Sequence, residues 1–489
     1  MDRRNFIYAG IGVVALVAIG AAAYFATKPA ETVTSISTSI ATSTTTATSA
    51  TTISTTVPTT SVITTTVPTT TKTTVTTTTS VGRPKMQILY MSTYAPALND
   101  WLTARTLEWA AKKGVDVELS TASYMEIVPK ILTGVETHNP PDLVFGSGSL
   151  IALMAEDPNA RNIVPLDDVY NEIGKDDVIE PVRRWYTMDG HIWAIDLFLF
   201  VDIVHLIKPF ADEVGRKPEE LKTWDDYIEF AREVKMRHPD MYPIGVTLGK
   251  CWDGCETWHL FWWPYGGEFM TERSSAGIKY NSQASRDTLQ KIIGLYKEGL
   301  ISPDMLQADE MLNNNAYLTQ KSAFIVEGPT PYYAAVTRNP ELASKTVLAP
   351  PPTGPKGMIT WGSKEAMCVF KESKNVDLAK DLLVYLFKDK TKYLTFINSG
   401  YYAAYPIFKS VEEKLKSDPV WARYLEVEPT IVDYTYPLNE PSKGADEVLT
   451  KFLFADAFSE TLINNKGVDE TIASIDVQMK EVFKRTYGK

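Results

Sequence analysis

The stretch PPDLVFGSGS, residues Pro140–Ser149, decides the fold. Its apolar run Leu143–Phe145 follows a proline pair and ends in small residues, which is typical of a buried strand that leads into a turn. Ser147 and Ser149 stand just beyond this strand. Ligands bind beyond the carboxyl ends of the strands in a parallel sheet, so both serines lie where a ligand is expected. For Ser149, capping a helix that begins near Leu150 is the alternative role.

Four further elements precede this strand in alternation. We expect strands at Met86–Tyr90 and Val115–Leu119, and helices at Asn99–Lys113 and Met125–Thr133. Gly114 ends the first helix, because glycine favours the position just after a helix. Strand, helix, strand, helix and strand in this order predict an α/β fold with a mostly parallel sheet covered by helices.

The N-terminal region has a different composition. Residues 32–80 are almost entirely Thr and Ser, which offer too little apolar surface to offset the entropy of ordering. Such a tract is typical of an O-glycosylated or plain extended stalk. Before it, Phe6–Ala26 is apolar or small and long enough to span a bilayer, and Arg3 and Arg4 place the N-terminus inside. We therefore expect a membrane anchor or signal at 1–27 and a disordered stalk at 28–84, with the globular part on the extracellular face of the cell membrane.

Three other fates of the apolar segment stay open. Ala21–Ala23 can be cut as a secretory signal, and Arg3–Ile7 is similar to a twin-arginine signal. Processing near Gly10 would resemble that of archaeal pilin-type signals and would leave most of the apolar stretch on the protein. Cleavage at the alanines would release the stalk from the membrane, so retention of the segment is the favoured reading.

The remaining 400 or so residues are enough for two lobes. The net charge of −11 argues against a nucleic acid partner, because an acidic surface repels the phosphate groups of the backbone. Eleven Trp, 24 Tyr and 18 Phe residues suggest a pocket lined with aromatic rings as well as a core. The composition therefore favours a protein that binds a small molecule.

The three cysteines allow more than one arrangement. Cys251 and Cys255 can form a disulfide, and Cys368 lies in an apolar run that predicts a buried free thiol. With His259 the first two give a spacing that can hold a metal, but no fourth ligand is evident. We expect no cofactor and no metal.

A series of short motifs follows in chain order: Pro141–Phe145, Val164–Asp168, Asp189–Asp196, Thr223–Tyr227, Tyr265–Glu268, Tyr296–Leu300, Lys321–Phe324, Ala349–Pro355, Ala379–Phe387 and Gly400–Pro406. Together they resemble the signatures of the family 1 extracellular solute-binding proteins, the maltose-binding-protein-like receptors of ABC importers. Within them Thr223 is expected to cap a helix, and Asp196 departs from the usual proline. The resemblance covers Met86–Lys489, and with the anchor and stalk it is to the archaeal membrane-anchored type.

The resemblance implies an α/β two-lobe periplasmic-binding-protein fold of the maltose-binding kind (type II) with three interlobe crossings. Lobe 1 would comprise residues 85–195 and 363–402, and lobe 2 residues 196–358 and 406–489. A sugar or oligosaccharide would bind between the lobes, shift them towards a closed form and be delivered to the permease subunits. The resemblance implies a receptor that is not an enzyme, and a monomer is expected.

Sugar rings present apolar faces and outward hydroxyls, so aromatic and polar side chains near the crossings and strand ends are the candidates for ligand binding. The richest segment is Cys251–Tyr265, in which Trp252 and Trp258 are expected to face the cleft, and Trp262 and Trp263 to be buried. The full set of candidates is Tyr94, Phe145, Ser147, Phe200, Asp202, Trp252, Asp253, Glu256, Trp258, Glu327, Tyr332, Trp361 and Tyr402.

Three other functions remain open at this stage. A membrane-tethered glycoside-active enzyme can use two carboxyl groups, and Asp225 with Asp226 or Asp253 with Glu256 are the candidate pairs. A receptor of the same fold can take a peptide or glycerol-phosphate, although only Lys250 lies near the Trp-rich segment to bind phosphate. A structural surface protein is the third, but no internal repeat appears outside the stalk.

Overall fold

The computed structural model describes residues 82–148 and 150–488. The predicted anchor Phe6–Ala26, the Ser/Thr-rich tract and Ser149 lie outside the described residues. Among the helices that are described, none is both long enough and apolar enough to cross a bilayer.

The first lobe is built on a six-stranded sheet. Its order is β12-β11-β3-β1-β2, with β6 paired to β11. The strands are β1 (Lys85–Met91), β2 (Asp116–Ala122), β3 (Leu143–Ser147), β6 (Ile195–Val201), β11 (Thr360–Val369) and β12 (Ile431–Val432). β1 is parallel to β2 and β3, with Ile88 opposite Leu143, which confirms the predicted parallel arrangement. β11 runs antiparallel to β3 and β6, so the sheet is mixed.

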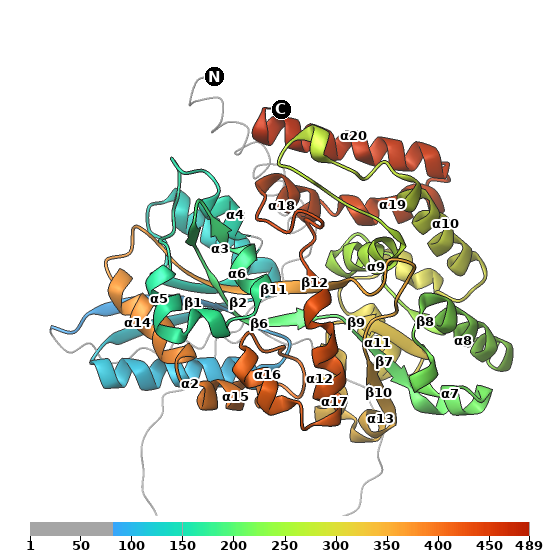
Figure 1. Ribbon diagram of the computed structural model, residues 1–489, viewed down its shortest axis with the longest axis horizontal. Helices are drawn as coiled ribbons and strands as arrows, with labels where there is room; N and C mark the ends of the chain where they lie inside the picture. Colours follow the sequence, from blue (N-terminus) through green and yellow to red (C-terminus); the bar gives the residue numbers. More distant parts are fainter. Residues whose placement is uncertain (1–81, 149, 489) are drawn as a thin grey trace, which may run out of the picture. The chain divides into compact units, whose positions relative to one another are not determined.

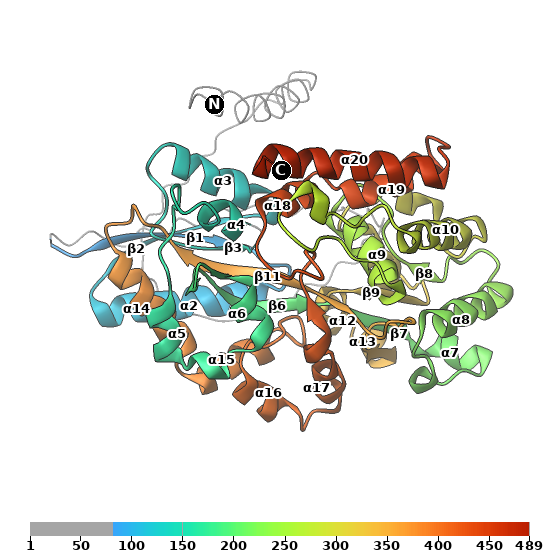
Figure 2. The ribbon, with the colours of Figure 1, turned by 45° about the horizontal axis from the view of Figure 1, so that its top comes forward.

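Helices cover this sheet on both faces. They are α2 (Pro96–Lys113), α3 (Tyr124–Glu136), α4 (Leu150–Ala155), α5 (Asp167–Ile173), α6 (Glu180–Trp185), α14 (Val376–Phe387), α15 (Lys390–Ser399), α16 (Lys409–Leu415) and α17 (Pro419–Tyr424). In Figures 1 and 2, α2 and α15 lie on one face and α3 on the other. A two-stranded hairpin, β4 (Thr187–Met188) and β5 (His191–Ile192), stands outside the sheet.

The start of α2 differs from the prediction. The helix begins at Pro96 and not after Asn99, because the Asn99 side chain accepts the Thr93 N–H (2.9 Å) from inside the first turn. Its end is as predicted: Gly114 adopts φ 68°, a left-handed conformation that glycine takes without steric cost.

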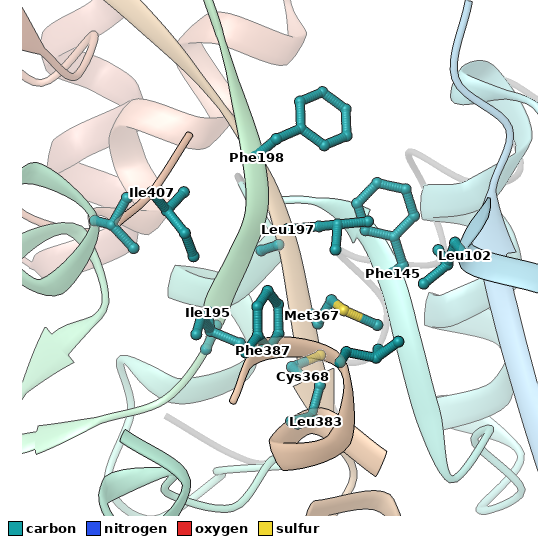
Figure 3. Packing of buried hydrophobic residues seen from close by; sticks show 14 of the residues in the cluster. Leu102, Phe145, Ile195, Leu197, Phe198, Met367, Cys368, Leu383, Phe387 and Ile407 are labelled. Carbon is teal, nitrogen blue, oxygen red and sulfur yellow. The ribbon is translucent and has the colours of Figure 1, made fainter. Parts of the chain in front are cut away.

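The core of the first lobe lies between the sheet and its helices. Figure 3 shows Phe145 of β3, Met367 and Cys368 of β11, and Leu383 and Phe387 of α14 packed together. Each large apolar side chain buried in this way stabilises the fold by about 1.5–3 kcal/mol relative to its exposed state. Cys368 is a buried free thiol, as predicted.

The second lobe has its own sheet and its own core. The sheet order is β10-β7-β9-β8, formed by β7 (Ile203–Ile207), β8 (Ile244–Gly245), β9 (Phe324–Glu327) and β10 (Thr346–Ala349). Its helices are α7 (Lys208–Val214), α8 (Trp224–Arg237), α9 (Trp252–Trp262), α10 (Gln283–Lys297), α11 (Leu312–Leu318), α12 (Thr330–Arg338), α13 (Pro340–Lys345), α18 (Lys443–Thr450), α19 (Leu453–Leu462) and α20 (Val468–Tyr487). In Figures 1 and 2, α18–α20 lie together along one side of this lobe.

Short 3₁₀ helices complete the described secondary structure. They span Lys175–Asp177, Pro218–Glu220, Trp263–Tyr265, Ser275–Gly277, Pro303–Gln307 and Leu425–Thr430.

Two local motifs of the second lobe have clear physical causes. Thr223 caps α8 as predicted: its hydroxyl accepts the Asp226 N–H (3.1 Å), and the Asp226 carboxylate accepts the Thr223 N–H (2.8 Å). In the paired-glycine turn, Gly266 has φ 90°, and a Cβ on Gly267 would lie 2.3 Å from the Trp262 ring. The first glycine is needed for its conformation and the second for close packing.

The main chain passes between the two cores at three places. These are the junction of β6 and β7 at Asp202, the strand β11, and β12, where Ile431 packs in the first core and Val432 in the second. The predicted number of crossings agrees with this path.

The third crossing is not at 400–406, where the sequence placed it. Phe408, Val411, Trp421 and Tyr424 pack in the first core, so α16 and α17 belong to the first lobe and not to the second. The cause is the packing of these side chains on the first sheet, where the Tyr424 hydroxyl donates to the Val201 carbonyl of β6 (2.8 Å).

Candidate functional site

Aromatic rings from both lobes meet at the N-terminus of α9. The ring of Tyr124, at the start of α3 in the first lobe, contacts that of Trp252 in the second lobe edge to face, with centroids 6.0 Å apart. Phe452 contacts the same indole at 5.9 Å. Tyr94, just after β1, is 51% exposed. Half-buried aromatic rings of this kind offer apolar faces to a ligand between the lobes.

Five carboxyl side chains lie next to these rings, and we call Asp202, Asp253, Glu256, Glu310 and Glu327 the acidic cluster. Asp253 and Glu256 are on the first two turns of α9, Glu327 ends β9, and Asp202 is at the first crossing. One carboxylate oxygen from each of Asp253, Glu256 and Glu327 lies within 4.8 Å of the other two. Asp202 contacts Glu256, and Asp253 contacts Glu310. The cluster is therefore one connected group.

Neighbouring groups hold two of these carboxylates in place. Glu310 accepts the backbone N–H groups of Trp252 (3.0 Å) and Asp253 (3.1 Å), so it occupies the N-terminus of α9, where the helix dipole favours negative charge. Asn313 donates its side-chain amide to Glu327 (2.7 Å). These contacts position the cluster before any ligand arrives.

Burial and like charges raise the pKa values of Asp202, Asp253, Glu256 and Glu327. Desolvation raises the pKa of Asp202 to about 7 and that of Glu327 to about 8, and in Glu327 the charge of Asp202 adds to the effect. The pKa values of Asp253 and Glu256 are raised well above the usual range by burial, and the charges that contribute most to these shifts are acidic. The cluster can accept hydrogen bonds or hold a positive charge.

The structure brings together most of the polar candidates. Asp253, Glu256 and Glu327 lie together, with Asp202 against Glu256, and Trp252 directly precedes Asp253. The charges of Glu310, Asp253, Glu365 and Glu327 raise the pKa of Tyr94, so this ring lies near the same carboxyl groups. Ser147 is buried at the end of β3 against the hydroxyl of Tyr124. Phe200 is half-buried near Gly328, which follows Glu327.

Three aromatic candidates, expected at the ligand, are buried in the two cores. Phe145 is buried against the rings of Tyr90 and Phe198. Figure 3 shows it beside side chains of β6 and β11. Trp258 is 0% exposed, packed on Tyr280 and Phe458.

Trp361 is 7% exposed against His259 and Trp263, and serves as hinge packing at the second crossing. The side chains of Phe145, Trp258 and Trp361 all lie on the side of their strand or helix that packs against the core. Trp262 and Trp263 are buried, as predicted.

Tyr332 and Tyr402 lie at a different place. Their rings are 5.8 Å apart, and the Tyr402 hydroxyl donates to Asp418 (3.0 Å). Tyr402 also lines a hollow of about 280 Å³ on the first lobe. The other residues that line it are Leu394, Asn398, Tyr401, Lys414, Leu415, Ser417, Asp418 and Trp421.

The predicted disulfide is not formed. Cys251 and Cys255 are buried free thiols. Cys251 is the N-cap of α9, with an extended backbone, and Cys255 lies inside the helix. His259 donates its Nδ1–H to the Cys255 carbonyl (2.6 Å) within an aromatic core, and among the described residues it is not grouped with the two thiols as possible metal ligands.

Three residues of the site were missed from the sequence. Tyr124 forms the aromatic pair with Trp252, Glu310 accepts N–H groups at the start of α9, and Asn313 donates to Glu327. Tyr124 follows β2 as Tyr94 follows β1, so the rule that ligands bind at the carboxyl ends of strands would have indicated it. Glu310 and Asn313 lie in a loop and a helix start far along the chain, where no local pattern indicates the site.

A family model described as bacterial extracellular solute-binding protein matches residues 105–428. No match is found among curated protein sequences.

Solved structures share the fold at low identity. An ABC transporter solute-binding protein from Thermotoga lettingae, bound with α-D-tagatose, is 19% identical with TM-score 0.71, covering 82% of this chain and 100% of its own. Maltose-bound MalE3 of T. maritima is 16% identical, with TM-score 0.69 and coverage of 81% and 99%.

A sugar transporter from Arthrobacter chlorophenolicus with bound laminaribiose is 15% identical, with TM-score 0.68 and coverage of 81% and 99%. At these identities the likeness is one of fold, and the family follows from the sequence model, which matches well over half of the chain. The chain belongs to the family of bacterial extracellular solute-binding proteins.

Proposed function

We propose that the protein is the receptor of an ABC transporter that captures a sugar or oligosaccharide between its two lobes and delivers it to the membrane permease. One observation carries the proposal: Tyr124 of the first lobe and Trp252 of the second meet beside a group of hydrogen-bond acceptors. A ligand that touches both lobes stabilises the form in which they meet.

The sugar class is supported by the chemistry of this position. Aromatic faces match the C–H faces of sugar rings, and carboxylates accept hydrogen bonds from hydroxyls. The structural neighbours are described with tagatose, maltose and laminaribiose. We assign stacking to Tyr94, Tyr124 and Trp252, and hydroxyl recognition to the acidic cluster.

A thermal-shift screen followed by calorimetric titration tests this function. The panel contains tagatose, maltose and laminaribiose, with a peptide mixture and glycerol-phosphate as the competing ligand classes. We expect one or more sugars to raise the melting temperature and to bind with micromolar affinity, about −8 kcal/mol. Binding of only the peptide or glycerol-phosphate would contradict the sugar assignment.

A glycoside-active enzyme is less well supported. Asp226 is committed to the cap of α8, and Asp225 contacts Lys291 (3.2 Å), so this candidate pair has structural roles. Asp253 and Glu256 lie on the same face of one helix, and their carboxylate oxygens are within 4.8 Å of each other, closer than the roughly 5–5.5 Å of retaining and 6.5–9.5 Å of inverting glycosidases. Incubation of the purified protein with the bound sugar should leave the sugar unchanged, and turnover would contradict the receptor.

We also propose that Phe6–Ala26 anchors the protein in the membrane and that the Ser/Thr-rich tract holds a monomeric receptor outside the cell near its permease. The apolar length of the first and the composition of the second support this. Cell fractionation is expected to find the full-length chain with the membrane, and deletion of residues 1–27 to release it.

A further inference from the structure

In the described residues, the acidic cluster contains the three carboxyl side chains whose oxygens lie close enough together to share one ion, and each of its members is at least partly buried. Asp202 is 4% exposed and Glu327 9% exposed. The Oδ2 atom of Asp202 is buried without a hydrogen-bond partner among the described residues, and its carboxyl group faces Glu256. A buried carboxylate without a partner indicates a positively charged group that completes the site.

The spacing of the oxygens suits a metal ion. Calcium–oxygen bonds are about 2.3–2.6 Å long, so two oxygens that share one Ca²⁺ lie at most about 5 Å apart. The carboxylates of Asp253, Glu256 and Glu327 meet this limit, since their oxygens lie within 4.8 Å of one another. No movement of the backbone is needed to bring them onto one ion.

The number and kind of ligands favour calcium over magnesium. Ca²⁺ accepts six to eight oxygens in a flexible geometry, whereas Mg²⁺ usually keeps several waters and uses only one or two carboxylates. The cluster offers three carboxylates, and a fourth, that of Asp202, lies against them. This number of carboxylate ligands matches Ca²⁺. Glu310 is less available, because it accepts two N–H groups of α9.

We propose that the acidic cluster binds one divalent cation of the calcium class through Asp253, Glu256 and Glu327, with Asp202 as a fourth oxygen ligand. The sequence alone predicted no metal here, and the proposal departs from that expectation. All four ligands come from the second lobe or the first crossing, so the site is formed without the first lobe.

The position of this cation connects it to the solute. The site adjoins Trp252, and the charges of two of its ligands, Asp253 and Glu327, also act on Tyr94. If the proposed function holds, on which this step rests, sugar hydroxyls complete the coordination of the ion. Solute affinity then depends on the cation.

The test uses the full-length protein, treated with EDTA and dialysed, with Tb³⁺ as a luminescent probe and Ca²⁺ as the competitor. Trp252 directly precedes Asp253, so excitation of tryptophan should sensitise Tb³⁺ emission at the site. We expect saturable emission with one ion per chain, displaced by Ca²⁺, and calorimetric binding of Ca²⁺ itself.

Isosteric variants identify the ligands. Glu256→Gln and Asp253→Asn should each weaken Ca²⁺ binding at least tenfold, whereas Glu268→Gln, which changes an exposed acid of the same lobe, should not. Asp202→Asn is the further variant if one of these fails to fold, as judged by circular dichroism. The proposal would be overturned if the wild type showed no saturable binding, or if the wild type and the folded ligand variants bound Ca²⁺ equally well. Binding of an organic amine without any response to Ca²⁺ would also overturn it.

Sugar titrations with Ca²⁺ and with EDTA separate the two claims. Calcium binding without any sugar binding supports the cation site and contradicts the proposed function. Sugar binding by a protein that binds no Ca²⁺ supports the function and overturns the cation site.

Discussion

Trp252 and Trp258 lie six residues apart on one helix and have different roles. At 100° per residue, Trp252, Asp253 and Glu256 share an arc of about 100°, and Trp258 and Trp262 lie on the opposite side of α9. The first arc contacts Tyr124, and the second packs on Tyr280. The role of each indole thus follows from its angle around the helix.

Trp252→Ala is expected to weaken solute binding about tenfold or more, because it removes the ring that contacts Tyr124. Titration calorimetry with a sugar found in the screen measures the change.

Trp258→Phe is the control. It removes buried volume from the second core, so it should lower the free energy of unfolding by about 1–3 kcal/mol and leave the affinity of the folded protein unchanged. Equal loss of affinity in both variants would contradict the assignment of Trp252 to the ligand.

Of the two α9 tryptophans expected to face the cleft, the one that stays partly exposed has polar neighbours on its own face. Trp252 shares its face with Asp253 and Glu256, which a buried helix face would not carry. Phe145 and Trp361 were placed wrongly because position at a strand end or crossing does not tell which side of the sheet a ring occupies. A helical projection of α9 would have separated Trp252 from Trp258, but no projection indicates Glu310.

Asp196 gives a pH-dependent contribution to stability. Burial raises its pKa to about 8, and the Tyr186 hydroxyl donates to it (2.6 Å). Since its pKa in the unfolded chain is near 3.9, the folded state holds a proton that the unfolded state releases between about pH 4 and 8. Its contribution to the free energy of unfolding is present at low pH and falls as pH rises through this range.

Asp196→Asn should remove this dependence, because the amide stays neutral and its oxygen still accepts from Tyr186. Melting temperatures of the wild type and the variant from pH 4 to 8 measure this dependence. We expect the melting temperature of the variant to rise relative to that of the wild type as the pH rises. A constant difference over the range would contradict the raised pKa. EDTA in all samples excludes effects of bound metal.

At the scale of elements, local signals predicted starts and ends that depend on one side chain. Gly114 ends α2 and Thr223 caps α8, as expected from their chemistry. The start of α2 was placed three residues late, because Asn99 and Pro96 are both compatible with a helix start and only the contact of Asn99 with Thr93 decides between them.

Thr223→Ala is expected to lower the free energy of unfolding by about 1 kcal/mol, since it leaves the Asp226 N–H without its acceptor at the start of α8. Urea denaturation measures the loss. Thr223→Ser keeps the hydroxyl and should retain most of the stability. A serine variant as unstable as the alanine variant would indicate that the methyl group, and not the cap, is responsible.

At the scale of the whole molecule, the sequence predicted two lobes and three crossings but assigned α16 and α17 to the wrong lobe. The alternation of strands and helices is enough to predict that β1 pairs in parallel with β2 and β3. It is not enough to place helices that follow a crossing. Tyr424 joins the first core through a contact with Val201, 223 positions earlier, and Trp421 packs beside it.

The two lobes are also joined away from the acidic cluster. Glu156, which follows α4 in the first lobe, accepts the Lys443 backbone N–H (2.8 Å) and the Tyr487 hydroxyl (2.9 Å) of the second lobe. Arg273 lies 3.3 Å from the same carboxylate. The contact accompanies the arrangement in which Tyr124 meets Trp252, so it should favour that arrangement over one with the lobes apart.

Glu156→Ala therefore tests whether the lobes are in equilibrium. Loss of these contacts should shift the solute-free protein towards separated lobes, increase its radius of gyration in small-angle scattering and lower the apparent solute affinity about two- to tenfold, because affinity scales with the populated binding-competent fraction. Lys443→Ala is the matched control, since Glu156 is bound by the backbone of Lys443 and not by its side chain. If Glu156→Ala changed neither quantity, or Lys443→Ala changed both equally, the contact would not control closure, and solute affinity would depend on the rings and the acidic cluster alone.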